Sequence, residues 1–345
     1  MTVSRRQALG LLGSLGLVAQ YGPARAARVF VAPDALMEAA RKEGELILYS
    51  ATFPEPQQEV INLFQKRFPF VRVNYVRASG GQLITRVRSE AAAGKLDADI
   101  IDHSDRGQAK DIENLFVPYA PPNAADFQPG TLVSPKLWPT YTPGWCIAWN
   151  SELVKNPPNN WMDLCKPEYG GGQIGQVIAP SGGSTWTRVM FERLVLGEDY
   201  WARQAATKPK LFPSGAPLSD AIVRGELLIA PLIYNIVFPK KQAGAPIDAI
   251  YGPEGIPIVP YGSGIATTAR HPNAARLYMD WILSEEGQAI SIRDQGNMTA
   301  LKNPPLSPDM YDPMAHKLWT PDFGPFQALQ NQWVEEWNKT YGYRQ

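Results

Sequence analysis

A serine- and glycine-rich turn interrupts the middle of the chain within residues 178–196, which read IAPSGGSTWTRVMFERLVL. An apolar run leads into Pro180, and a helical pattern with Val189, Leu194 and Leu196 on one side follows the turn. Backbone N–H groups and hydroxyls that point one way at the positive end of a helix dipole suit an anion. The turn is therefore predicted to contact a ligand through Ser181, Gly183, Ser184, Thr185 and Trp186.

A second turn of this kind, Ser79-Gly80-Gly81, follows the alternating run VRVNYVR and starts the helical stretch ASGGQLITRVRSEAAAG. Arg77 stands just before it and would add a bidentate contact to a carboxylate or phosphate, with outward solvation as the alternative. For both turns the alternative is plain capping, in which Ser79 and Ser181 satisfy helix N-termini and bind nothing.

Strand and helix patterns alternate around these turns in the first part of the chain. Residues 44–51, 71–77 and 97–105 read as strands, and residues 54–69 read as a helix between the first two. This order predicts an α/β domain with a parallel sheet, in which ligands bind outside the carboxyl ends of the strands. The residues expected at that edge are Ser50, Thr52, Ser79, Gly80, Gly81, His103 and Ser104. A structural or solvated role is the alternative for His103.

The second part of the chain repeats the pattern. Residues 144–154, 175–186 and 219–235 read as strands with turns or helices, and residues 255–268 read as a strand that returns to the first domain. Residues 271–290 form an amphipathic helical pattern. The residues expected at the ligand edge here are those of the 181–186 turn, Ser214 and Tyr234. Trp186 and Tyr234 would cover an apolar part of the solute, with ordinary packing as the alternative.

The N-terminus has the layout of an export signal. Residues 1–26 combine a basic start, a short apolar run and an Ala24-Arg25-Ala26 end, and Arg5-Arg6 resembles a twin-arginine signal. Cleavage near Ala26 removes three of 33 basic residues and none of 33 acidic ones, which leaves a net charge of about −3. A chain so close to neutrality has no broad basic surface for nucleic acid.

Two cysteines, Cys146 and Cys165, are the only ones in the chain. Export favours one disulfide between them, with two buried thiols as the alternative. Catalytic signatures are absent from the sequence: it has no G-x-S-x-G elbow, no H-E-x-x-H and no P-loop, and its three histidines are scattered. The sequence therefore does not predict an enzyme, and no cofactor or metal is predicted. A secreted hydrolase is the alternative from another functional class.

Six stretches in order resemble the bacterial extracellular solute-binding proteins of ABC importers, in the branch with ferric-, phosphonate-, thiamine- and sugar-phosphate-binding members. They cover most of residues 44–300. The stretches are LILYSAT, RASGGQLITRVRSEAAAGKLDADII, GWCIAWNSELV, IAPSGGSTW, AIVRGELLIAPLIYN and HPNAARLYMDWILSEEGQAI.

This resemblance implies an α/β type II periplasmic-binding-protein fold, with two lobes of mixed, mostly parallel sheets joined by crossing hinge strands. The first lobe would comprise residues 27–120 and 258–300, the second residues 121–257, and the helical tail 301–345 would pack across them. It also implies a monomer that closes on one small solute and meets a membrane permease. A partnership with a sensor kinase remains an alternative that the sequence leaves open.

The solute depends on where this chain departs from the family. Ferric-binding members carry two adjacent tyrosines after the strand that matches ELLIAPLIYN, where this chain has Leu232 and Ile233 before a single Tyr234. A ferric ion prefers several anionic oxygen ligands, so a small organic anion is the first hypothesis. Ferric iron held by Tyr234, Asp102 and Asp105 is the alternative.

Overall fold

The computed structural model describes residues 26–128, 131–132, 134–306, 310–311, 314–321 and 328–344. The predicted export signal, residues 1–26, lies outside this range except for its last residue. The helices that position the site lie at α2 (Pro54–Arg67), α3 (Gly80–Ala92), α4 (Arg106–Asp111), α5 (Ser184–Leu194), α7 (Gly215–Val223) and α8 (Tyr234–Gln242). The outer helices are α1 (Asp34–Glu43), α6 (Tyr200–Ala205), α9 (Pro272–Ile282), α10 (Glu285–Gln295) and α12 (Gln330–Tyr341).

The first lobe is built on a sheet with the order β2-β1-β3-β11-β4. The central strand β1 (Glu45–Ser50) is buried along almost its whole length, as its apolar sequence requires, and it pairs in parallel with β2 (Arg72–Arg77) and β3 (Ile100–His103). The strands β11 (Gly262–Ile265) and β4 (Trp138–Pro139) continue the sheet in antiparallel pairing. The predicted parallel order of the first three strands is confirmed.

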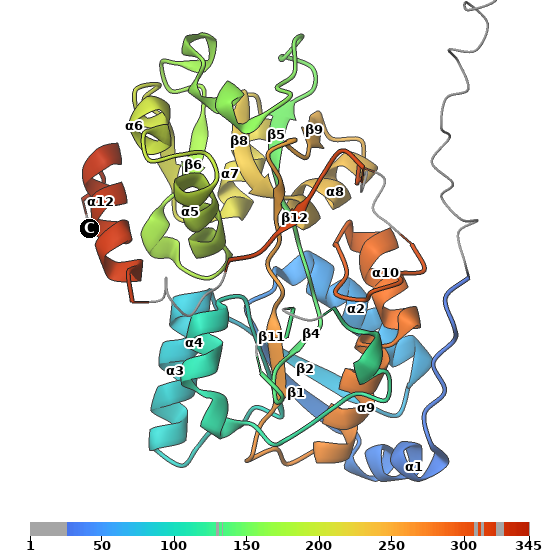
Figure 1. Cartoon of the computed structure of the whole chain (residues 1–345). Helices are drawn as coiled ribbons and strands as arrows, with labels where there is room; N and C mark the ends of the chain where they lie inside the picture. The colour runs from blue at the N-terminus through green and yellow to red at the C-terminus, as the bar shows by residue number, and fades with distance from the viewer. Residues whose placement is uncertain are drawn as a thin grey trace, which may run out of the picture.

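The second lobe contains an antiparallel sheet with the order β8-β5-β9 and a parallel pair, β6-β7. Their bounds are β5 (Trp145–Asn150), β6 (Gly175–Val177), β7 (Lys210–Phe212), β8 (Ile229–Ile233) and β9 (Ile247–Ile250). An isolated parallel bridge between Ile174 and Ile229 links the two sets. Figure 1 shows this lobe above the first one.

Two chain segments cross side by side between the lobes. One joins β4 to β5, and the other joins β10 (Ile256–Pro257) to β11. The Val259 N–H donates to the Pro143 carbonyl at 2.9 Å, and the Tyr261 N–H donates to the Tyr141 carbonyl at 2.8 Å. The strands that follow these crossings, β5 and β11, form the antiparallel pairs, so the sheets are mixed as expected. The sheet β8-β5-β9 of the second lobe is wholly antiparallel, whereas mostly parallel sheets were expected. The chain stays with the first lobe through β4, beyond the expected boundary at residue 120.

The stretch predicted as one helix at residues 271–290 is two helices, α9 and α10. The first ends at Ile282, and the Ser284 hydroxyl accepts a hydrogen bond from the Gly287 N–H at 3.2 Å to start the second. None of the helices among the described residues has the length and apolar character needed to cross a membrane.

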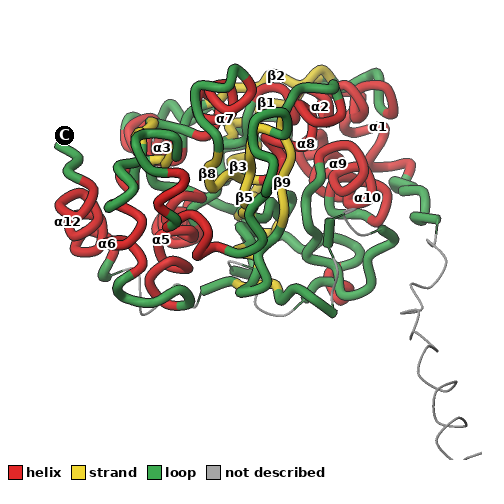
Figure 2. Tube along the Cα trace, turned by 90° about the horizontal axis from the view of Figure 1, so that it is seen from above, coloured by secondary structure: helices red, strands yellow, loops and turns green. Residues whose placement is uncertain are grey.

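The C-terminal tail contacts both lobes. The helix α12 buries Trp333 and Trp337 against the second lobe, where Trp333 packs on Trp186 and Trp201. Before it, β12 (Leu318–Trp319) pairs with β10, and Arg106 of the first lobe donates to the Thr320 hydroxyl at 3.3 Å. Figure 2 shows α12 beside α6 at one side of the molecule, opposite α1, α9 and α10.

Candidate functional site

A pocket of about 520 Å³, including the part open to solvent, lies where the two lobes face each other. Its walls come from the carboxyl ends of strands and from the turns that follow them, the edge at which α/β sheets bind ligands. The lining residues from the first lobe and the crossing segment are Ala51, Phe53, Arg77, Ser79, Gly80, Ser104 and Tyr261. Those from the second lobe are Trp145, Val177, Ser181, Gly182, Gly183, Ser184, Thr185, Ser214, Gly215, Leu232, Ile233 and Ile236.

Four helices begin at this pocket. The residues before their first turns are Ser79 for α3, Gly183 for α5, Ser214 for α7 and Ile233 for α8, and all four line the pocket. No side chain in the described part of the chain caps any of these four N-termini. The positive ends of four helix dipoles therefore meet at one place, which favours negative charge there.

The serine hydroxyls of the two turns do not cap helices, in contrast to the plain-capping alternative. The Ser79 hydroxyl donates to the Gln82 side-chain oxygen at 2.9 Å, and the Ser181 hydroxyl donates to the Pro213 carbonyl at 2.9 Å. Within the described residues, the backbone N–H groups of Gly80, Gly183 and Ser184 donate to no acceptor. These donors remain available to a ligand.

Two side chains add polar groups to the same region. Thr185 is only 4% exposed and lines the pocket, yet its hydroxyl has no hydrogen-bond partner among the described residues. The Arg77 guanidinium lies 5.6 Å from the centre of the Phe53 ring and forms no ion pair within the part of the chain that the structure describes. Arg77 is also the one charged side chain in the lining, because no carboxylate or imidazole belongs to it.

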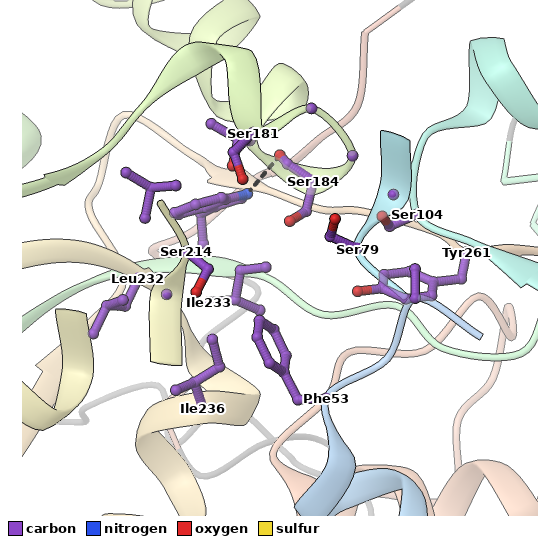
Figure 3. Close-up of a pocket in the computed structure, with 18 of the residues that line it drawn as sticks. Phe53, Ser79, Ser104, Ser181, Ser184, Ser214, Leu232, Ile233, Ile236 and Tyr261 are labelled. Carbon is purple, nitrogen blue, oxygen red and sulfur yellow. Dashed lines mark hydrogen bonds between the residues drawn. The ribbon is translucent and has the colours of Figure 1, made fainter. Parts of the chain in front are cut away.

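The remaining wall is apolar. Leu232, Ile233 and Ile236, at the end of β8 and the start of α8, face Phe53 of the first lobe. In Figure 3 these four side chains occupy the lower part of the view, whereas Ser79, Ser104 and Ser184 lie above them. The Trp145 indole N–H donates to the Ser184 carbonyl at 3.1 Å and holds the turn in place.

The two lobes approach closely at three small residues. A Cβ atom placed on Gly80 would lie 3.2 Å from the Gly183 Cα, and one placed on Gly183 would lie 2.6 Å from the Ser104 Oγ. Gly183 also has a φ of +58°, which disfavours other residues. Glycine at these positions allows the opposing edges of the two lobes to touch.

Three residues predicted to contact the ligand lie below the pocket instead. The hydroxyls of Ser50 and Thr52 donate to the buried Asp102 carboxylate at 2.6 and 3.1 Å. The His103 ring lies 2.8 Å from the Gly80 carbonyl through Nε2 and accepts from the Asp105 N–H at 3.0 Å. His103 thus has the structural role that was its alternative, and it holds the α3 turn in position.

Three further predicted residues also lie outside the lining. Trp186 is buried against Trp333 of α12, and Tyr234 is buried against Phe238 and Tyr251. Both side chains follow the helix into the core of the second lobe, so ordinary packing describes them. Gly81 is an exposed residue of α3. The other predicted residues, Ser79, Gly80, Ser104, Ser181, Gly183, Ser184, Thr185 and Ser214, do line the pocket.

Several lining residues were not predicted. Phe53 directly follows the predicted Thr52, Trp145 is the first residue of β5, and Tyr261 belongs to the crossing segment before β11. The position of Phe53 next to a strand end was a usable signal. Trp145 and Tyr261 had none, because their approach to the pocket depends on how the lobes face each other.

The favoured disulfide is wrong, because both cysteines are free. Cys146 is buried in β5 and its thiol donates to the Leu232 carbonyl at 3.2 Å, within the β5-β8 pairing. Burial raises the pKa of Cys165 to about 11, so this thiol is protonated at neutral pH. Neither thiol contributes to the pocket.

The possible iron ligands are separated by the fold. Asp102 is buried beneath the pocket and Tyr234 faces the second-lobe core, and no group of three or more His, Cys, Asp or Glu residues within the described ranges is arranged to hold a metal ion. Burial raises the pKa of the Tyr261 hydroxyl, the one phenol in the lining, and keeps it protonated.

Solved structures share this fold. The AfuA periplasmic binding protein of Actinobacillus pleuropneumoniae, with fructose-6-phosphate bound, matches with a TM-score of 0.71 and 21% identity over 87% of this chain and 99% of its own. The substrate-binding protein of an ABC transporter from Agrobacterium tumefaciens matches with a TM-score of 0.76 and 15% identity, over 92% and 99%. Iron-bound HitA from Pseudomonas aeruginosa matches with a TM-score of 0.68 and 18% identity, over 86% and 99%.

Sequence comparison identifies the family. An uncharacterized protein of Haemophilus influenzae is 28% identical over 195 residues, which is 53% of this chain and 56% of that protein's length. The match thus spans just over half of this curated relative. The family model for bacterial extracellular solute-binding proteins matches residues 46–289, which confirms the resemblance noted in the sequence. The chain belongs to the bacterial extracellular solute-binding protein family.

Proposed function

We propose that this protein captures a small organic anion, a carboxylate, phosphonate or phosphate ester, between its two lobes in the periplasm and presents it to an ABC permease. The observation that carries the proposal is the pocket itself. Four helix N-termini converge there on Arg77 and the Thr185 hydroxyl, and the described residues provide these helices with no side-chain cap, Thr185 with no partner and the lining with no carboxylate. The fructose-6-phosphate bound to AfuA, a protein of the same fold, is an anion of this kind.

Closure of the lobes would complete the site. The donors of α3 come from the first lobe and those of α5 from the second, so an anion contacts both sets only when the lobes are together. A ligand that binds the closed form more tightly shifts the population toward it. A permease would recognise the closed form that this coupling produces. We expect the protein to bind and close as a monomer. A sensor kinase as the receiving partner would use the same site and the same closure.

Ferric iron is the second candidate, because HitA, a protein of this fold, is iron-bound. Fe³⁺ prefers anionic oxygen ligands, and the lining offers one buried phenol with a raised pKa and no carboxylate. The lining therefore supports an organic anion over iron. Hydrolysis lacks support for a related reason, since the described lining contains no His, Asp or Glu, and the His103 ring next to the lining Ser104 already bonds to the Gly80 carbonyl and the Asp105 N–H.

A thermal-shift screen of the mature protein tests the proposal. The ligands are carboxylates, phosphonates, sugar phosphates, thiamine and ferric citrate, each added separately. A ligand at a hundred times its Kd adds about 2.7 kcal/mol to the free energy of unfolding, which raises Tm by several degrees. Stabilisation by organic anions is the expected result, and a response to ferric citrate but to no organic anion would overturn it.

The double variant Ser184→Ala with Thr185→Ala tests the turn directly. It removes two hydroxyls that line the pocket, and we expect the Kd of the best anion to rise at least tenfold, about 1.4 kcal/mol. Isothermal titration gives this Kd. The variant Ser181→Ala is the control. The Ser181 hydroxyl is already bonded to the Pro213 carbonyl, so its removal should change the Kd much less. An unchanged Kd in the double variant would remove the turn from the site.

A further inference from the structure

The pocket is divided into a polar half and an apolar half, and the apolar half restricts the solute. We infer that the ligand is an amphipathic anion, with a charged head and a non-polar body, and that polyhydroxylated anions such as sugar phosphates bind poorly. The inference rests on the proposed function, since it describes the body of the anion that the helix N-termini would hold.

The apolar wall is built from residues that are fixed by their surroundings. Leu232 and Ile233 end a fully buried strand, and Ile236 lies in the first turn of α8. A Cβ on Gly215 would come within 2.8 Å of the Ile236 Cδ1, so the absence of a side chain at Gly215 gives Ile236 its place. The wall is therefore packed against the core of the second lobe.

Phe53 closes this half from the first lobe. Its ring carries Arg77 at 5.6 Å from the ring centre, so the cation lies at the border between the polar and apolar halves. An anionic head paired with Arg77 would thus direct the rest of the molecule along Phe53 toward the Ile236 side (Figure 3). Both lobes contribute to the contact with the body.

Few hydrogen-bonding groups face the body. Beside Leu232, Ile233, Ile236 and Phe53, the polar side-chain groups nearest this half within the described lining are the hydroxyls of Ser214 and Tyr261. A body with several hydroxyls would lose its bonds to water and regain few, which costs affinity, whereas a non-polar body gains by leaving water. This is the reason that the apolar half discriminates between anions with the same head.

Head-matched ligand pairs test the inference by isothermal titration. One pair is phenyl phosphate against fructose 6-phosphate, and the other is 4-methylpentanoate against gluconate. We expect the non-polar member of at least one pair to bind at least tenfold more tightly. If, in both pairs, the polyhydroxylated member binds as tightly as the non-polar member or more tightly, the inference fails while the proposed function stands. If no member binds and only iron does, the proposed function fails with it.

Variants separate the two halves. Ile236→Thr keeps the β-branch but replaces the ethyl group with a hydroxyl, so it should weaken the binding of the non-polar anion at least fivefold and leave that of the polyhydroxylated anion unchanged or improved. Phe53→Ser, at a partly exposed position, serves the same purpose if Ile236→Thr fails to fold. Leu153→Thr changes an apolar side chain that is 52% exposed and outside the pocket, and it should alter neither Kd. Equal loss for both anions in the Ile236 and Phe53 variants would overturn the inference.

Discussion

At the scale of single residues, Arg77 carries the charge of the site. It is exposed at the end of β2 and contacts Phe53 without an ion pair in the described residues. Arg77→Gln should raise the Kd of any bound anion about tenfold, or ~1.4 kcal/mol, because a charge-assisted bond is lost. Titration at low and high salt measures the effect, and the difference between arginine and glutamine should shrink at high salt.

Arg72→Gln is the matched control for this prediction. Arg72 is also an exposed arginine on β2, at the other end of the strand and outside the pocket. The Arg72→Gln variant alters the net charge by the same amount as Arg77→Gln. A similar loss of affinity in both variants would therefore mean that Arg77 acts only through the overall charge.

The residue types at strand ends were sufficient to predict the edges of the pocket but not the direction of each side chain. Ser184 and Thr185 line the pocket, while the adjacent Trp186 turns into the core, because the positive φ of Gly182 and Gly183 sets where the helix begins. A strand followed directly by a helix sends Tyr234 into the core in the same way. Backbone angles of this kind leave no periodic signal in the sequence.

At the scale of elements, the Asp102 carboxylate ties the first-lobe sheet together. It accepts hydrogen bonds from Ser50, Thr140 and Ser263 at 2.6, 3.3 and 2.6 Å, on three neighbouring segments of the sheet. Burial nevertheless raises its pKa above the ordinary aspartate value, although the hydroxyls of Ser263, Ser50 and Thr52 and nearby His103 oppose the shift. The folded protein therefore holds the proton of Asp102 more tightly than the unfolded chain does.

This difference predicts how stability depends on pH. Between the unfolded pKa of about 3.9 and the raised folded pKa, the folded state binds more protons, so the free energy of unfolding falls as pH rises. Asp102→Asn removes that dependence. The difference in Tm between wild type and Asp102→Asn should accordingly be most favourable to the wild type near pH 4 and decline as pH rises. Melting curves over this range measure it.

The variant Asp111→Asn is the control for this pH dependence, since the Asp111 carboxylate is half exposed and pairs with Arg88. A Tm difference between wild type and Asp102→Asn that grows with pH would contradict the raised pKa.

The elements themselves were largely predictable, because apolar runs and helical periodicity mark them. Residues 44–51 and 71–77 contain β1 and β2, and residues 54–69 contain α2. The break between α9 and α10 was missed, since Ser284 stands in an unbroken helical pattern and its capping contact is visible only in three dimensions. The antiparallel entry of β5 and β11 depends on the crossing of the chain, which no local pattern records.

At the scale of the whole molecule, the contact between lobes depends on glycine. Gly183→Ala would place a methyl group 2.6 Å from the Ser104 Oγ, so either the Ser104 hydroxyl turns away or the lobes stay farther apart, and we predict the second. We expect the Kd of the bound anion to rise at least tenfold and the radius of gyration of the saturated protein, measured by small-angle scattering, to exceed that of the wild type.

Gly182→Ala separates closure from backbone strain. Gly182 also has a positive φ, +65°, but a Cβ placed on it has no atom within 4 Å. Both alanines carry the cost of an unfavourable backbone, roughly 1–3 kcal/mol of stability, and only the Gly183 variant meets the opposite lobe.

Gly80→Ala and Gly81→Ala repeat the comparison from the first lobe without positive φ, because a Cβ on Gly80 lies 3.2 Å from the Gly183 Cα and one on Gly81 is in open space. If the two members of each pair bind the anion equally well, the approach of the lobes at these glycines has no part in holding it; if Gly183→Ala and Gly80→Ala alone lose affinity, closure at this contact contributes to binding.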